Sequence, residues 1–107
     1  MKLPIIISEG LDLGLYSTLE MAQISIEPTD VLNGIYSLYD SSGNILVAKV
    51  VETPNGSQVE IHPTGATDQE ALAELLRDFL KETGSEETAV NTKGLDQLVE
   101  LSENFFE

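Results

Sequence analysis

The residues of this chain that are able to do chemistry are nearly all carboxylates. Its 107 residues include nineteen Asp and Glu, five Lys and Arg, one histidine and no cysteine. Because cysteine is absent, thiolate catalysis, disulfide bonds and cysteine-ligated zinc are excluded. A histidine needs companion residues to act as a catalytic base or to bind a metal. We therefore interpret the lone His62 as a surface residue at the end of a strand.

No catalytic sequence motif accompanies these residues. The chain has no HExxH, EF-hand or Walker lysine pattern. The run Gly10–Gly14 lacks the glycine spacing of a dinucleotide-binding motif. A serine nucleophile would have to recruit His62, and no nucleophile elbow lies nearby. We expect no catalytic residues, no cofactor and no enzymatic activity.

Three polar residues have the oxygen ligands that a hard cation prefers. Asp12, Asp40 and Asn44 could together bind such a cation weakly. The same residue types are required by hairpin turns, and Asp40 to Asn44 has the sequence of a turn. We prefer the turn interpretation and predict no metal site.

The net charge of −14 is the dominant feature of the composition. Such a chain repels nucleic acid and anionic membranes and favours a basic protein partner. Plain solubility explains the same charge without any partner. The residues from Asp68 onward hold eleven acids and three bases, so their acidity per residue is roughly twice that of the first part of the chain. The predicted partner-binding residues are carboxylates of this part: Asp68, Glu74, Asp78, Glu82, Glu86 and Glu87.

Two classes of function follow from these observations. The first is an interaction domain that presents carboxylates to a basic protein. The second is a structural or regulatory homodimer, paired through the C-terminal helix or an open edge of the sheet. Phe105 and Phe106 either close the core or form an exposed patch for dimerisation, and we prefer the core. An enzyme using paired carboxylates is a third hypothesis, which a deep pocket with converging acids would support.

The elements that must position these residues have an α+β pattern. Residues Ile35–His62 contain three strand-like runs separated by turn sequences, which predicts a three-stranded antiparallel meander. The middle run, Ile45–Val51, is apolar on nearly both faces, so we predict a strand covered on both sides. Two further strands are expected at residues 4–8 and 11–16.

The helices are predicted from capping and apolar spacing. Ser17 as the N-cap residue with Glu20 forms a capping box and predicts a short helix that ends before Pro28. Residues 63–66 are predicted to be a loop. After it, a helix over 68–83 carries leucines at spacings of three and four, and we expect it to pack on the apolar face of the sheet.

The C-terminal part is predicted to be an acidic linker at residues 84–92 followed by a last helix at about 93–105. A length of 107 residues suits one core. We therefore predict a single α+β domain over residues 1–107, an antiparallel sheet packed against two to three helices. No run approaches the ~18 to 20 apolar residues of a membrane span, and we expect a cytoplasmic protein.

Two segments resemble a pattern of small uncharacterised bacterial proteins. Residues Glu27–Tyr36, EPTDVLNGIY, resemble EPxDVxNGEY, and residues Tyr39–Asn44, YDSSGN, resemble YDSEGR. The resemblance covers about Ile5 to Ile61. It departs from the pattern at Ile35, where the pattern has an acid, and at Ser42–Asn44, where the pattern has Glu-Gly-Arg. The residues from Gly84 onward look like an addition.

The resemblance implies a fold, a bacterial origin and an immunity or toxin-neutralising role. Turn chemistry also explains most of the matching residues, because Asn33–Gly34 and Asp40–Asn44 have the residue types that turns need. We prefer this structural explanation for the motif positions.

Overall fold

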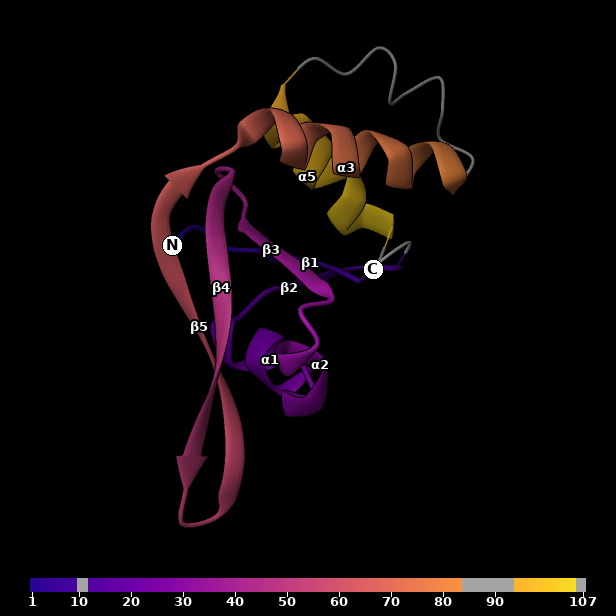
Figure 1. The fold of residues 1–107 in the computed structure, drawn as a ribbon. Helices are drawn as coiled ribbons and strands as arrows, with labels where there is room; N and C mark the ends of the chain where they lie inside the picture. The colour runs from indigo at the N-terminus through magenta and orange to yellow at the C-terminus, as the bar shows by residue number, and fades with distance from the viewer. Residues whose placement is uncertain (10–11, 84–93, 106–107) are drawn as a thin grey trace.

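A computed structural model of the chain describes residues 1–9, 12–83 and 94–105, except for the side chains of residues 104 and 105. In chain order the elements, shown in Figure 1, are β1 (Ile5–Glu9), β2 (Asp12–Tyr16), α1 (Leu19–Ile24), α2 (Pro28–Leu32), β3 (Tyr36–Asp40), β4 (Asn44–Thr53), β5 (Gly56–Thr67), α3 (Gln69–Glu82) and α5 (Leu95–Phe105). The predicted linker at 84–92 and Phe106 lie outside the described residues.

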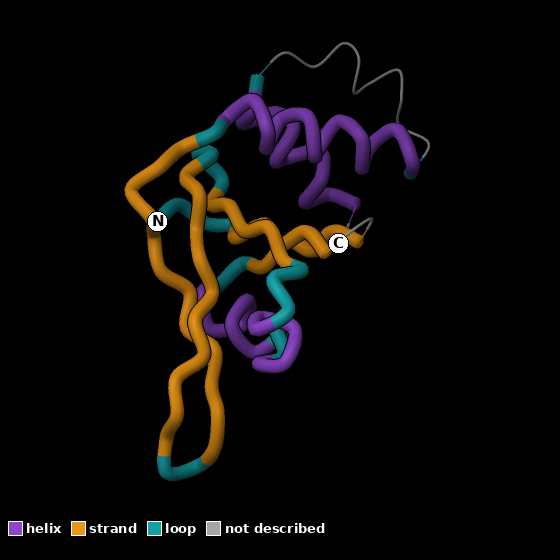
Figure 2. The backbone as a smooth tube through the Cα atoms, in the orientation of Figure 1, coloured by secondary structure: helices purple, strands orange, loops and turns teal. Residues whose placement is uncertain are grey.

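The five strands form one antiparallel sheet in the order β2-β1-β3-β4-β5. The α+β class and the β3–β4–β5 meander are confirmed. Its two turns contain Gly43 and Gly56, which both have positive φ. Figure 2 shows the β4–β5 hairpin extending beyond the helices, which gives the molecule a long axis of 49 Å against 26 and 23 Å.

Helices cover both faces of the sheet, with α3 and α5 on one side and α1 and α2 on the other (Figure 1). Each face has its own apolar core. The core on the α1 and α2 side contains Ile5, Ile7, Ala22, Ile26, Leu38, Leu46, Val59 and Ile61. The core on the α3 and α5 side contains Ile6, Leu72, Leu76, Leu80, Leu98 and Val99.

The strand covered on both faces is β1, because its consecutive isoleucines point alternately into the two cores. Ile5 and Ile6 are both 0% exposed. The prediction that Ile45–Val51 is covered on both sides was wrong, since only Leu46 of that run is buried. The reason is that β4 is covered on one face only: Leu46 belongs to the core on the α1 and α2 side, no residue of β4 belongs to the core on the α3 and α5 side, and Val47 is 36% exposed.

The leucine stripe of α3 packs as predicted. Leu72, Leu76 and Leu80 recur every four residues and are at most 2% exposed. They meet Leu98 and Val99 of α5 and Ile6 of β1. Full burial of each leucine stabilises the fold by about 2 kcal/mol. The N-cap residue is Asp68, whose Oδ1 accepts a hydrogen bond from the Ala71 N–H at 2.9 Å.

The first two helices differ from the prediction. The N-cap of α1 is Thr18 rather than Ser17, because Thr18 Oγ1 accepts a hydrogen bond from the Met21 N–H at 3.1 Å. The short helix α2 was not predicted. Pro28, which we expected only to stop α1, begins it as the first helical residue. That position needs no N–H, and the fixed φ of proline suits a helix.

The two possible caps of α1 predict different stabilities. Replacing Thr18 with alanine should lower the free energy of unfolding by about 1 kcal/mol, because the Met21 N–H loses its acceptor. Replacing Ser17 with alanine should change it by less than about 0.5 kcal/mol. Urea unfolding of both variants checks this, and equal losses would contradict the assignment of Thr18.

The predicted loop at residues 63–66 is instead the end of β5, which continues to Thr67. Proline is tolerated there because β5 is an edge strand. The Thr64 hydroxyl donates to the Ile45 carbonyl at 2.8 Å, and the register shifts between Asn44 and Leu46. The strand therefore passes directly into the N-cap of α3.

Within the described ranges, no helix combines the length and the apolar character needed to cross a membrane.

Candidate functional site

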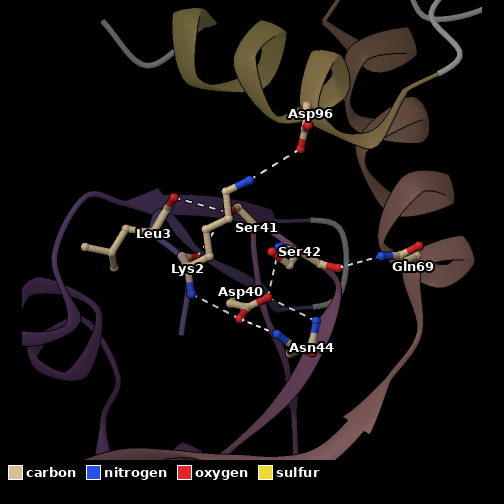
Figure 3. A network of polar contacts seen from close by, with 8 residues as sticks. All are labelled: Lys2, Leu3, Asp40, Ser41, Ser42, Asn44, Gln69 and Asp96. Atoms are coloured by element: carbon tan, nitrogen blue, oxygen red, sulfur yellow. Dashed lines mark hydrogen bonds and ion pairs between the residues drawn. The ribbon is translucent and has the colours of Figure 1, made fainter.

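The buried carboxylate of Asp40 is fully occupied by N–H donors (Figure 3). Asp40 is 0% exposed. It accepts hydrogen bonds from the backbone N–H groups of Lys2 (3.1 Å), Ser42 (2.9 Å) and Asn44 (3.0 Å), and from Nδ2 of Asn44 (2.7 Å). Burial raises the pKa of Asp40, but the hydrogen bonds from Asn44, Lys2 and Ser42 outweigh burial and hold the pKa below its ordinary value. A carboxylate surrounded by donors in this way is a structural anion.

The Asp40 network joins three distant parts of the chain (Figure 3). The Ser41 hydroxyl lies 3.1 Å from the carbonyl oxygens of Lys2 and of Leu3. Gln69 Nε2 donates to the Ser42 carbonyl at 3.1 Å, and the Asp68 N–H donates to the Gly43 carbonyl at 2.8 Å. The start of the chain, the β3–β4 turn and the start of α3 are therefore held together by hydrogen bonds, each of which involves at least one backbone group.

The structure separates the residues considered for a cation. Ile5 of β1 pairs with Asp40, whereas Glu9 at the other end of β1 pairs with Asp12. Four residues of strand separate the two ends by roughly 13 Å. Among the described residues, no group of three His, Asp or Glu side chains could hold a metal ion.

His62 lies on the surface of β5. Its Nε2 is 3.0 Å from Oε1 of Glu60, and the two side chains are 47% and 49% exposed. Residues two apart in a strand share a face, so this contact is a local surface pair.

The predicted partner-binding residues divide into four groups. Asp68 caps α3 and Glu74 lies in an open hollow with Glu70 and Arg77. Asp78 and Glu82 line a groove at the C-terminal half of α3. Glu86 and Glu87 lie outside the described residues. The structure therefore brings together only Asp78 and Glu82 of the predicted set.

The groove containing Asp78 and Glu82 has a volume of about 330 Å³ and lies between α3 and the β1–β2 strands; we call it the acidic groove. Its walls are apolar and its rim is charged. It is lined by Ser8, Asp12, Leu13, Leu75, Asp78, Phe79, Lys81 and Glu82. The apolar slot is therefore surrounded by three exposed carboxylates and one ammonium group, those of Asp12, Asp78, Glu82 and Lys81.

Ser8 is the buried polar residue of the acidic groove. It is 7% exposed and lies on the same face of β1 as Ile6, since alternate residues share a face. Its hydroxyl has no hydrogen-bond partner among the described residues, and its oxygen is partly accessible to solvent. It therefore offers a donor and an acceptor to whatever enters the groove.

Further acidic residues lie at the end of the sheet that contains the acidic groove. Glu9 pairs across the strands with Asp12 on one side and with Tyr36 on the other. Like charges placed opposite each other destabilise a strand pair. The Tyr36 hydroxyl donates to Asp30 Oδ2 at 3.2 Å. Burial raises the pKa of Tyr36, and the Asp30 hydrogen bond and the Glu9 charge raise it further.

Sequence reasoning missed Asp12 and Ser8 as parts of this site. Each belongs to a predicted strand, and the acidity of the C-terminal part drew attention to α3 alone. Leu75 and Phe79 of α3 pack against the same core as Leu13 of β2, and this shared packing brings Asp12 and Asp78 to one groove.

Comparison of this chain with known proteins finds no matching protein-family model, no matching curated protein and no matching solved structure.

Proposed function

We propose that this chain is a non-enzymatic interaction domain that binds a basic protein partner in the cytoplasm through its acidic groove. One observation carries the proposal: Asp12 of β2 lies with Asp78 and Glu82 of α3 around an apolar slot that contains the Ser8 hydroxyl, for which the described part of the chain offers no hydrogen-bond partner. A lysine or arginine side chain matches this slot. Its methylene groups suit the apolar walls, and its charged end suits the carboxylates.

The charge of the whole chain supports the same partner. A net charge of −14 accelerates the encounter with a basic protein and disfavours acidic competitors. The exposed carboxylates of the groove do not resemble a catalytic pair, because a general acid requires a carboxylate that its surroundings desolvate. The resemblance of residues Glu27–Tyr36 and Tyr39–Asn44 to small bacterial proteins supports a more specific role, in which the chain is an immunity or toxin-neutralising protein.

Removing the two α3 carboxylates tests the acidic groove. A labelled peptide of alternating lysine and glycine serves as the cationic probe. The double variant Asp78→Asn/Glu82→Gln should bind it about tenfold more weakly than the parent chain, since two charge-assisted contacts are lost. Fluorescence anisotropy at low and moderate salt measures the affinity, which should fall as salt rises.

The matched control removes the same charge elsewhere. Glu100→Gln/Glu103→Gln changes two exposed carboxylates of α5 that do not line the acidic groove. This variant should keep most of the affinity. Equal losses in the two double variants would mean that net charge alone attracts the probe, and the groove would then have no specific role.

A homodimer is the alternative function. Leu98 and Val99 of α5 are buried in the chain's own core, and Leu95 and Leu101 pack against that core. A homodimer would therefore pair through the open sheet edges β2 and β5. Light scattering at low and moderate salt distinguishes the two functions. A dimer that is indifferent to salt would replace the proposal of a basic partner.

A further inference from the structure

The outer edge of β5 has backbone groups that point away from the sheet. The Ile61 N–H donates to Oε1 of Gln23 on α1 at 3.0 Å, so it faces away from β4. Alternate residues of an antiparallel strand direct their N–H and C=O groups to the same side. The register between β4 and β5 is unbroken from Val47–His62 to the turn. The N–H and C=O groups of Val59 and Ser57 therefore also face outward.

Part of this edge is closed to another strand. Gln23 occupies the Ile61 N–H, and Pro63, the next outward-facing residue, has no N–H. Proteins protect edge strands from unwanted pairing with devices of this kind. No described side chain is seen to bond the N–H groups of Ser57 and Val59, so the unprotected stretch is Ser57–Val59.

A groove of about 470 Å³ lies beside the unprotected stretch; we call it the edge groove. One wall is β5 and the other is α1 with the residues that follow it. Ile24 of α1 is 77% exposed, which leaves a large apolar side chain without cover. The edge groove is lined by Glu20, Gln23, Ile24, Ile26, Pro28, Ser57, Gln58 and Val59.

The charge around the edge groove selects a cationic occupant. Glu20 lines it, Glu27 precedes the lining residue Pro28, and Glu52 accepts a hydrogen bond from the Ser57 hydroxyl at 2.8 Å. None of the residues that line the edge groove is basic. A second copy of this chain would bring the same carboxylates and its own Gln23 to the contact, and like charges oppose such pairing.

We propose that the edge groove binds an extended, basic segment of a partner protein, which pairs with Ser57–Val59 as an added strand. The backbone of the segment bonds the outward-facing N–H and C=O groups of Ser57 and Val59, and alternate side chains meet Ile24 and Glu20. The edge groove contains Ile26 and Val59 of the α1-side core, whereas the acidic groove opens on the opposite face of the sheet. The inference therefore goes beyond the proposed function and does not depend on it.

Two synthetic peptides of equal charge test the added strand. One alternates lysine with valine and is able to form a strand; the other alternates lysine with proline, whose fixed φ of about −65° holds the peptide in the polyproline II conformation rather than in a strand. We expect the Lys-Val peptide to shift the amide NMR signals of Ser57 and Val59 and to slow their hydrogen exchange. The Lys-Pro peptide should leave both unchanged. Changes in NMR signals that are confined to residues of the acidic groove would overturn the proposal. Formation of a homodimer, seen as a doubling of the protein's mass, would also overturn it.

A matched pair of substitutions isolates the backbone bond. Ser57→Pro and Ser57→Ala both remove the hydroxyl that bonds Glu52, but only Ser57→Pro removes the outward N–H. Ser57→Pro should weaken binding of the Lys-Val peptide about tenfold relative to Ser57→Ala. Equal affinities in two folded variants would overturn the proposal.

A third variant changes binding in the opposite direction. Gln23→Ala frees the Ile61 N–H and lengthens the unprotected edge. It should therefore tighten binding of the Lys-Val peptide and extend the slowed exchange to Ile61. If Gln23→Ala has no effect on affinity or weakens it, the edge of β5 is not the binding surface, whatever happens to the fold of Ser57→Pro.

Discussion

Replacing Asp40 with asparagine is expected to lower the free energy of unfolding by about 3 kcal/mol at neutral pH. The Asp40 carboxylate accepts four hydrogen bonds, three of them from backbone N–H groups. An asparagine has one oxygen acceptor instead of two. Its NH2 group is itself a donor, so it cannot accept hydrogen bonds from the N–H groups that surround it. Because the site is buried, water does not replace the lost bonds. Urea unfolding of the purified variant measures the loss.

The same carboxylate makes stability depend on pH. The pKa of Asp40 is lower in the folded chain than its ordinary value. Its contribution is therefore fully present above the unfolded pKa of about 3.9, and it is lost as pH falls through that value to the lower folded pKa. In the parent chain, stability should fall over this acidic range. Asp40→Asn should remove the part of this decrease that comes from Asp40. The free energies of unfolding of the parent chain and the variant should therefore converge as pH is lowered.

Asp96→Asn is the control for Asp40→Asn, because it removes the same charge from an exposed site. Among the described residues, the partner of Asp96 is Lys2, in a surface ion pair with Nζ 3.6 Å from Oδ1. Such pairs contribute about 0–1 kcal/mol. A loss at Asp40 no larger than the loss at Asp96 would show that the Asp40 network does not hold the fold together.

Replacing Gly43 with alanine is expected to cost about 3–4 kcal/mol, from two separable causes. The first is backbone strain, because φ of Gly43 is +88° and residues with a Cβ rarely adopt that region. The second is a collision: the added Cβ would lie 2.7 Å from Cγ and 2.9 Å from Cα of Gln69. The Cα belongs to the first residue of α3, so relief requires the helix to move away from the turn.

Gly65→Ala separates these two causes. Gly65 has nearly the same φ, +84°, but a Cβ added there meets no heavy atom within 4 Å. It should cost only the strain, about 1–2 kcal/mol. The difference between the two variants, measured by urea unfolding, reports how closely α3 docks on the β3–β4 turn. Equal costs would contradict that close approach.

Local chemistry predicted the turns and the amphipathic helices well. The glycines at 43 and 56 and the leucine spacing of α3 each specify a conformation within a few residues. Predictions from the local sequence were wrong at Pro28 and Pro63, because a proline at each position is compatible with two different structures. Pro28 either ends one helix or begins another, and Pro63 either breaks a strand or sits on its edge. Which outcome occurs depends on what lies beside the chain.

The candidate sites show the same limit. The carboxylates of Asp78 and Glu82 were identified from the acidity of the chain, but their companions Asp12 and Ser8 were not. The free edge at Ser57–Val59 was not visible either, because it depends on Gln23 bonding Ile61. Nothing in a linear sequence relates residues that lie this far apart.

The sequence by itself determined the α+β class, the meander, the strong negative charge and the absence of cysteine chemistry, since these follow from composition and from spacings of two, three and four residues. The tertiary structure decided that β1 rather than β4 is covered on both faces, that Asp40 is a buried anchor, and that carboxylates of β2 and α3 share one groove. These features arise from contacts between distant segments, which form only when two separate cores pack on opposite faces of one sheet.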